Sequence, residues 1–255
     1  MSSFRSENPS QHAPAGEVPA GMHTTYWSDA AGRDRARLEL YRYFLRPGDL
    51  AFDIGANVGE VTGVLLAMGC RVVAVEPQHE TAQYIPPGAA VVEAVCAAEL
   101  GEVEFWETPT NRYLSTARRD IADQNVATNG AWTSSAGLKP TTTLDALVAE
   151  YGLPAFVKID VEGYETEVLR GLSHALPALS FEVHSFDQAK IGACMQLLGE
   201  LGDYGYLYSP LESYRVEVWP PRALGFFGDV YATLRAEPRE RALEAVPPHT
   251  LRAPG

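Results

Sequence analysis

The stretch from Phe52 to Thr62, FDIGANVGEVT, contains the signal that decides the fold. The short apolar run that ends at Phe52 is typical of a buried strand, and apolar residues at helical spacing resume from Val61 to Met68. Glycine between the two elements lets the backbone turn tightly and approach a ligand closely. The connection predicted to hold a cofactor consists of Gly55, Ala56, Asn57 and Gly59. This order of strand, glycine turn and helix indicates a site for a nucleotide-type cofactor.

The residues of this loop distinguish between two classes of cofactor. Dinucleotide-binding loops follow G-x-G-x-x-G, in which the second glycine lets the backbone approach a pyrophosphate. Asn57 stands at that position here. The loop therefore disfavours NAD and is compatible with a cofactor that has no phosphate, of which S-adenosyl-L-methionine is an example.

Two carboxylates complete the predicted cofactor site. Asp53 ends the first strand, and Glu76 follows 23 positions later, at the end of the apolar strand 71–75. A carboxylate at that point can accept hydrogen bonds from both ribose hydroxyls, and Asp53 can then face the ammonium of the methionyl part. The alternative is a generic α/β turn in which Asp53 caps the helix.

Composition limits the classes of partner. With 255 residues, 46% of them hydrophobic, the chain can bury an α/β core without disulfides. Cys70, Cys96 and Cys194 contain no C-x-x-C pair, so buried reduced thiols are expected. The net charge of −13, without a Lys/Arg cluster, argues against a nucleic-acid or anionic-membrane partner. The sequence leaves the oligomeric state open.

The two ends of the chain differ from the middle. The N-terminus lacks the charged and apolar regions of a signal peptide, and no apolar stretch is long enough to span a bilayer, so a cytoplasmic protein is expected. Residues 1–20 are rich in Ser, Pro, Ala and Gly, and residues 236–255 are similar. We expect a disordered tail over 1–20, one domain over 21–235 and a flexible tail over 236–255.

Between these tails the pattern alternates strands with helices. We expect strands at 50–54, 71–76, 90–95, 155–160, 178–184, 204–208 and 226–234. We expect helices at 33–45, 59–68, 143–150, 164–172 and 188–201. The predicted fold is α/β and Rossmann-like, a mostly parallel seven-stranded sheet with an antiparallel edge and helices on both faces.

A second informative run is AFVKIDVEGYETEVLRGL, from Ala155 to Leu172. A buried strand presents Lys158, Asp160 and Glu162 on one face before Gly163 turns the chain into a helix. Open α/β sheets bind ligands at this end of a strand, so Lys158 and Asp160 are candidate catalytic residues. Alternatively, these two residues form a buried salt bridge that merely fixes the strand end.

The next predicted strand ends in FEVH, which places Glu182 and His184 on one face. If the cofactor is S-adenosyl-L-methionine and its methyl group goes to an alcohol, a base must remove the proton of that alcohol. His184 is the first candidate for this base, because imidazole accepts protons near neutral pH. An ordinary surface histidine is the alternative. The carboxylates Asp160, Glu162 and Glu182 could instead hold a divalent cation such as Mg²⁺, with His184 as a further candidate ligand.

The region 106–140 is expected to be a long loop that acts as a substrate-binding or lid element. It carries aromatic, amide and guanidinium groups suited to a sugar or polyhydroxylated ring: Trp106, Arg112, Tyr113, Ser115, Arg118, Arg119, Asn125, Asn129 and Trp132. A solvated insertion without ligand contacts is the alternative.

Six segments together resemble the FkbM family of S-adenosylmethionine-dependent methyltransferases. They are FDIGANVGEVT, AVEP at 74–77, GEVEF at 101–105, TTTLDALV at 141–148, VKIDVEGYETEVLRGL at 157–172 and FEVH at 181–184. The resemblance implies a class I methyltransferase fold and adds Pro77 to the cofactor residues. It also implies methylation of a hydroxyl on a sugar or natural product.

Three other functions remain open at this point. The chain could be a catalytically inactive methyltransferase fold that serves as a binding or assembly protein, although Asp53, Glu76 and Asp160 would then have no reason to be kept. An N-methyltransferase would act on an amine and could dispense with a base. An NAD-linked oxidoreductase is opposed by Asn57.

Overall fold

A computed structural model of the chain describes residues 30–108, 112–129, 134–185, 187–210, 214, 216–221, 224 and 227–235. The tails expected over 1–20 and 236–255 lie outside the described residues. The three cysteines are buried and form no disulfide, as expected.

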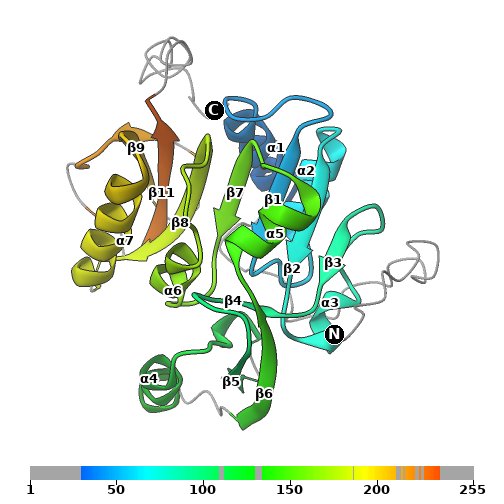
Figure 1. The fold of residues 1–255 in the computed structure, drawn as a ribbon, viewed down its shortest axis with the longest axis vertical. Coiled ribbons are helices and arrows are strands. Elements are labelled where there is room, and N and C mark those ends of the chain that lie inside the picture. The colour runs from blue at the N-terminus through cyan, green and yellow to red at the C-terminus, as the bar shows by residue number, and fades with distance from the viewer. Residues whose placement is uncertain are drawn as a thin grey trace.

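One large sheet organises the structure (Figure 1). Its strand order is β10-β9-β11-β8-β7-β1-β2-β3, in which β3, β2, β1, β7 and β8 are parallel and β11 runs antiparallel to both β8 and β9. The strands are β1 (Leu50–Ile54), β2 (Arg71–Val75), β3 (Ala90–Val92), β7 (Phe156–Ile159), β8 (Ala178–His184), β9 (Tyr204–Pro210), β10 (Glu217–Val218) and β11 (Phe227–Leu234). The predicted class I methyltransferase architecture is confirmed, with all seven expected strands and the antiparallel edge. The two-residue β10 is an addition.

Helices cover both faces of this sheet because its strands are apolar on both faces. In β1, Phe52 and Ile54 pack with helices α5 (Leu144–Tyr151), α6 (Glu165–Arg170) and α7 (Gln188–Leu201). Ala51 packs on the opposite face with α1 (Ala30–Tyr41) and α2 (Glu60–Ala67). The short α3 (His79–Ala82) follows β2. No helix in the described part of the chain is long and apolar enough to cross a membrane.

The expectation of a long loop at 106–140 is wrong. This region contains a 3-10 turn, η1 (Arg112–Leu114), a helix, α4 (Arg119–Asn129), and most of strand β6 (Ser134–Thr142). β6 pairs antiparallel with β5 (Glu102–Glu107) and parallel with β4 (Val95–Cys96). These strands form a second, smaller sheet beside the large one (Figure 1). Strand β6 was not predicted, because its sequence, SSAGLKPTT, has no alternation of apolar residues and contains Gly and Pro.

Candidate active site

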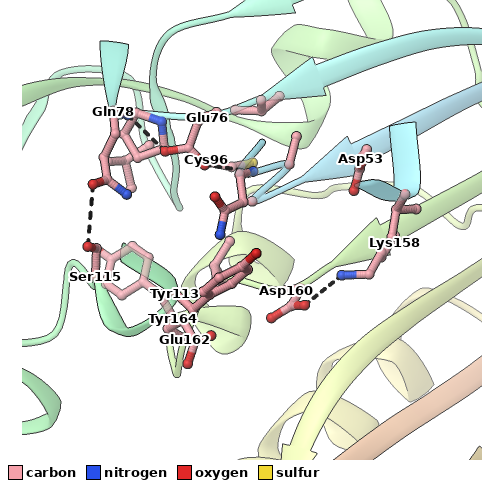
Figure 2. Close-up of a pocket in the computed structure, with 18 of the residues that line it drawn as sticks. Asp53, Glu76, Gln78, Cys96, Tyr113, Ser115, Lys158, Asp160, Glu162 and Tyr164 are labelled. Carbon is pink, nitrogen blue, oxygen red and sulfur yellow. Dashed lines mark hydrogen bonds and ion pairs between the residues drawn. The ribbon is translucent and has the colours of Figure 1, made fainter. Parts of the chain in front are cut away.

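A cavity lies at the carboxyl ends of β1, β2 and β7, where the sequence predicts the ligand. Most of the predicted cofactor and strand-end residues line it: Asp53, Gly55, Ala56, Asn57, Glu76, Pro77, Lys158, Asp160 and Glu162. Figure 2 shows Glu76 and Gln78 at one end of the cavity and Asp53, Lys158 and Asp160 at the other. The cavity can therefore receive an elongated ligand with chemically different ends.

Asp53 supplies an unusual carboxylate to this cavity. It is 1% exposed, and its Oδ2 accepts a hydrogen bond from the Thr62 hydroxyl at 2.7 Å. Its Oδ1 is buried and has no hydrogen-bond partner among the described residues. Burial raises the pKa of this carboxyl above its ordinary value. A buried acceptor left without a donor is costly, so a cationic ligand group would fit here.

The alternative role of Asp53 as a helix cap is wrong. The residue at the N-cap of α2 is Gly59, and no side chain caps this helix among the described residues. A capping carboxylate would accept a backbone N–H at the start of the helix. Asp53 instead accepts the side-chain hydroxyl of Thr62, which lies within α2.

Glu76 is held rigidly by the backbone. Its Oε2 accepts the N–H of Asn57 and its Oε1 accepts the N–H of Gln78, both at 2.9 Å. Burial raises the pKa of the carboxyl to about 7, against the lowering effect of these two bonds. The Gln78 side chain also hydrogen-bonds this carboxylate, and the two lone pairs of each oxygen leave it capacity to accept from a ligand as well. This arrangement fits a pair of neighbouring ribose hydroxyls.

The glycine loop brings two strand ends together. Gly55 has a φ of 80°, and a Cβ there would lie 1.8 Å from the Asp160 carbonyl oxygen. Asn57 adopts a φ of 51°, a conformation that asparagine tolerates better than most residues, and this directs its N–H to Glu76. Gly59 does not line the cavity, because it packs against Pro86 on the far side of the loop.

We expect Gly55→Ala to lower the free energy of unfolding by about 2 kcal/mol or more, because the new methyl group meets backbone and the φ is strained. Gly192→Ala in α7 is the matched control, since a Cβ there meets nothing within 4 Å. Alanine should stabilise that helix by roughly 0.5–1 kcal/mol. Chemical denaturation measures both variants, and a Gly55→Ala protein as stable as the wild type would contradict this packing.

Lys158 and Asp160 form a partly buried ion pair with Nζ 2.7 Å from Oδ2, and Lys158 lies opposite Asp53 in the β1–β7 register. Burial alone would lower the pKa of the ammonium, but the charges of Asp160, Asp53 and Asp229 together hold it well above its usual value. The same pair keeps the pKa of Asp160 low despite burial. The salt-bridge alternative is thus correct as geometry, while both residues also line the cavity.

The predicted acidic residues also come together. Asp160, Glu162 and Glu182 each offer an oxygen within 4.8 Å of the others. Burial, and then the charge of Asp160, raises the pKa values of Glu162 and Glu182 well above the ordinary value. The His184 Nδ1 lies 3.8 Å from a Glu182 oxygen. Burial and the charge of Lys190 lower the pKa of His184, so its imidazole is neutral at pH 7.

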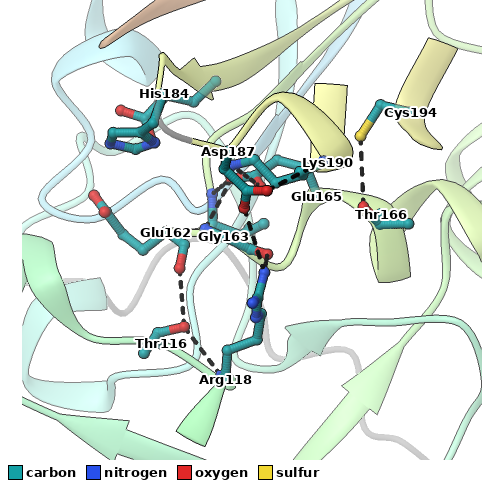
Figure 3. A network of polar contacts seen from close by, with 12 residues as sticks. Thr116, Arg118, Glu162, Gly163, Glu165, Thr166, His184, Asp187, Lys190 and Cys194 are labelled. Carbon is teal, nitrogen blue, oxygen red and sulfur yellow. Dashed lines mark hydrogen bonds and ion pairs between the residues drawn. The ribbon is translucent and has the colours of Figure 1, made fainter. Parts of the chain in front are cut away.

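Glu182 and His184 do not line the cavity itself. They come from β8, beyond β7, and Figure 3 shows Glu162 between His184 and Thr116. The structure therefore separates the predicted residues into two groups. The predicted cofactor residues except Gly59 line the cavity with Lys158, Asp160 and Glu162, whereas Glu182 and His184 lie outside its lining.

A polar network fixes the turn that carries Glu162, which has a φ of 52° (Figure 3). Glu165 is fully buried, accepts the Gly163 N–H at 3.1 Å and binds Lys190 Nζ at 2.7 Å. On the other side, the Thr116 hydroxyl donates to the Glu162 carbonyl at 2.9 Å.

The region 106–140 joins the same turn through Arg118, whose Nη1 donates to the Gly163 carbonyl at 3.2 Å. Of the residues singled out there, Tyr113 and Ser115 line the cavity. Asn125 instead donates to the Leu114 carbonyl, and exposed Arg119 lies 3.9 Å from Asp123. The side chains of Arg112, Asn129 and Trp132 lie outside the description.

Arg37 and Gln78 are among the cavity residues that the sequence analysis did not single out. Gln78 stands two positions after Glu76, and its side-chain oxygen accepts the Ser115 hydroxyl at 3.4 Å. Its place directly after the AVEP segment was an available signal. Arg37 had no such signal, because it comes from a helix that precedes the first strand.

Strand-end carboxylates around a glycine turn, on a sheet of this order, are the arrangement expected of a methyltransferase-type cofactor site. The Methyltransferase FkbM domain matches residues 53–208. The chain therefore belongs to the FkbM methyltransferase family.

A curated relative is the hexuronic acid methyltransferase AglP of Haloferax volcanii, 28% identical over 149 residues that cover 54% of this chain and 56% of that protein. The chain thus matches little more than half of the relative's length. Among solved structures, a TehB-like SAM-dependent methyltransferase from Corynebacterium glutamicum is 11% identical, with a TM-score of 0.43 over 78% of this chain and 88% of that one. A ribosomal protein L11 methylase from Lactobacillus delbrueckii subsp. bulgaricus is 13% identical, with a TM-score of 0.41 over 81% and 79% of the two chains.

Proposed function

We propose that the protein is an S-adenosylmethionine-dependent O-methyltransferase that acts on a hydroxyl of a sugar or natural-product molecule. The observation that carries this proposal is the pair of buried carboxylates at the two ends of one cavity. Asp53 has a buried oxygen that lacks a donor among the described residues, and Glu76 has acceptor capacity beyond its two backbone bonds. One cofactor with an ammonium and a ribose diol matches both.

Asp53 would hold the ammonium of the methionyl part, and Glu76 would accept both ribose hydroxyls. The loop of Gly55, Ala56 and Asn57, together with Pro77, would follow the cofactor between them. The bound cofactor supplies a methyl group already activated on a sulfonium. The protein therefore needs to align the acceptor, exclude water and remove one proton.

His184 is the residue that we assign to proton removal. Its imidazole is neutral, so a ring nitrogen would accept the proton of the acceptor hydroxyl. Lys158 stays an ammonium and cannot act as a base, which leaves it to orient Asp160 and an acceptor oxygen. The element at 106–140 would close the cavity over the ligand through Tyr113 and Ser115.

The acceptor class is supported by the relative AglP, which is named as a hexuronic acid methyltransferase. A direct test incubates the protein with S-adenosylmethionine carrying a labelled methyl group and with hexuronic acids, neutral sugars and amine analogues. We expect label in a sugar ether. Transfer to the amine analogues alone would contradict O-methylation.

Metal assistance is a second candidate, favoured by the oxygens of Asp160, Glu162 and Glu182 within 4.8 Å. Oxygen ligands at this separation suit a hard divalent cation, which would lower the pKa of an acceptor hydroxyl. The Lys158 ammonium already neutralises part of this charge, which supports the metal-free mechanism. The label assay is therefore repeated with EDTA and with added Mg²⁺. Activity that survives EDTA supports His184 acting alone.

The affinity for the cofactor should depend on pH through Glu76, whose pKa is about 7. The ribose hydroxyls need the ionised carboxylate, so protonation below that pH removes one acceptor. We expect the affinity to be constant above pH 8 and to fall by up to about tenfold per pH unit below 7. Calorimetry across this range measures it. Glu76→Gln should bind weakly and without this dependence, and a wild-type affinity unchanged from pH 8 to 5.5 would contradict the assignment.

A further inference from the structure

Arg37 lies in the wall of the cofactor cavity, although it belongs to α1 rather than to the loops at the strand ends. It is 3% exposed, and the same cavity wall contains Asp53 and Glu60. A buried guanidinium is costly unless an anion or several hydrogen bonds compensate it. None of the residue roles proposed so far involves the charge of Arg37.

Among the described residues, carboxylates of Glu60 and Asp34 lie within 4 Å of the Arg37 guanidinium. Arg37 Nη1 lies 3.4 Å from a Glu60 oxygen, and the same oxygen lies closer, at 3.1 Å, to Nη1 of a second buried arginine, Arg33. The other carboxylate, on Asp34, lies 3.8 Å from Arg37 and is half exposed. A charge-assisted hydrogen bond is usually 2.7–2.9 Å long. Among the described residues, Arg37 and Arg33 thus contact the same Glu60 oxygen.

The orientation of Arg37 is fixed by a neutral partner. Its Nε donates to the Tyr214 hydroxyl, and its guanidinium carbon lies 5.5 Å from the centre of the Tyr214 ring. Tyrosine holds the side chain in place without cancelling its charge. The guanidinium is thus positioned in advance, and its charge reaches Asp53, where it is among the groups that oppose the effect of burial on the pKa of that carboxyl.

We propose that Arg37 binds the carboxylate of the cofactor's amino-acid part, an inference that rests on the proposed function. The α-ammonium and α-carboxylate of an amino acid share one carbon, so a site that takes the ammonium at Asp53 needs a cation beside it. Arg37 meets this requirement. Lys158 also lines the wall, but its ammonium binds Asp160 at 2.7 Å and lies near Asp53 and Asp229 as well.

The test compares S-adenosylmethionine with decarboxylated S-adenosylmethionine, which lacks only this carboxylate. Calorimetric dissociation constants are measured for the full-length wild type, Arg37→Gln, Arg37→Lys and the control Arg33→Gln. We expect the wild type to prefer the intact cofactor by roughly 30-fold, and Arg37→Gln to reduce this preference to within about threefold. Arg37→Lys should retain an intermediate preference, because lysine keeps the charge but not the fork.

Arg33→Gln should keep the wild-type preference, because Arg33 shares Glu60 but does not line the cavity. An equal loss of affinity for both ligands in Arg37→Gln would overturn the inference and indicate a structural role. An unchanged preference in Arg37→Gln, or the same change in Arg33→Gln, would also overturn it. If Arg37→Gln does not fold, an unchanged preference in Arg37→Lys would do so. A wild type that binds neither ligand would instead refute the proposed function.

Discussion

Replacing Asp53 by asparagine should weaken the binding of S-adenosylmethionine by roughly 100-fold, because the variant loses the negative charge that faces the cofactor's ammonium. The amide oxygen can still accept the Thr62 hydroxyl, so the local packing is retained. Burial raises the pKa of the Asp53 carboxyl, which means that its ionised form costs folding free energy at neutral pH. The neutral variant should therefore be at least as stable as the wild type.

This combination of lost affinity and retained stability separates binding from folding. Calorimetric titration measures the first, and thermal unfolding of the cofactor-free protein measures the second. Asp49→Asn is the matched control, because the Asp49 carboxylate accepts the Arg46 N–H at the protein surface and does not line the cavity. An Asp53→Asn protein with wild-type affinity would show that this carboxylate does not hold the cofactor.

Replacing His184 by alanine should lower kcat by about 10²- to 10⁴-fold, the usual contribution of a positioned general base. The dissociation constant of the cofactor should not change, because His184 does not line the cofactor cavity. In the wild type, burial and Lys190 lower the pKa of His184, so with saturating cofactor the rate should decrease only at a pH below the ordinary titration range of histidine. Single-turnover rates with the labelled cofactor measure both effects.

His174→Ala is the control for this variant, since His174 is a partly exposed histidine whose Nδ1 lies 3.2 Å from Asp145, away from the cavity. Full activity of His184→Ala on a hydroxyl acceptor would remove His184 from the mechanism. Full activity on an amine acceptor alone would favour N-methylation, which needs no base.

The sequence predicts well which strand-end residues line the cavity, because these residues belong to short local patterns. Asp53 and Glu76 each end a strand of continuous apolar residues, and parallel strands bring their carboxyl ends to one edge. The grouping of Asp160 with Glu182 follows from the same rule applied to β7 and β8. Hydrophobic periodicity and the positions of the strand ends were sufficient to predict where these residues lie.

The features of the fold and the site that the sequence did not predict depend on long-range packing. Arg37 reaches the cavity because α1 packs against α2, a contact that no local pattern announces. Gly59 lies beside the predicted loop but turns toward Pro86, since only the backbone conformation determines which side it faces. The small sheet formed by β5 and β6 was missed because β6 is polar and its pairing is non-local.

The most direct measurement is a calorimetric titration of the wild-type protein with S-adenosylmethionine and, separately, with NAD. A cavity with Asp53 at one end and Glu76 at the other should bind S-adenosylmethionine with a dissociation constant on the order of micromolar. NAD should give no heat of binding, because Asn57 stands where a pyrophosphate would need glycine. A folded protein that binds NAD, or that fails to bind S-adenosylmethionine, would contradict the assignment of this cavity.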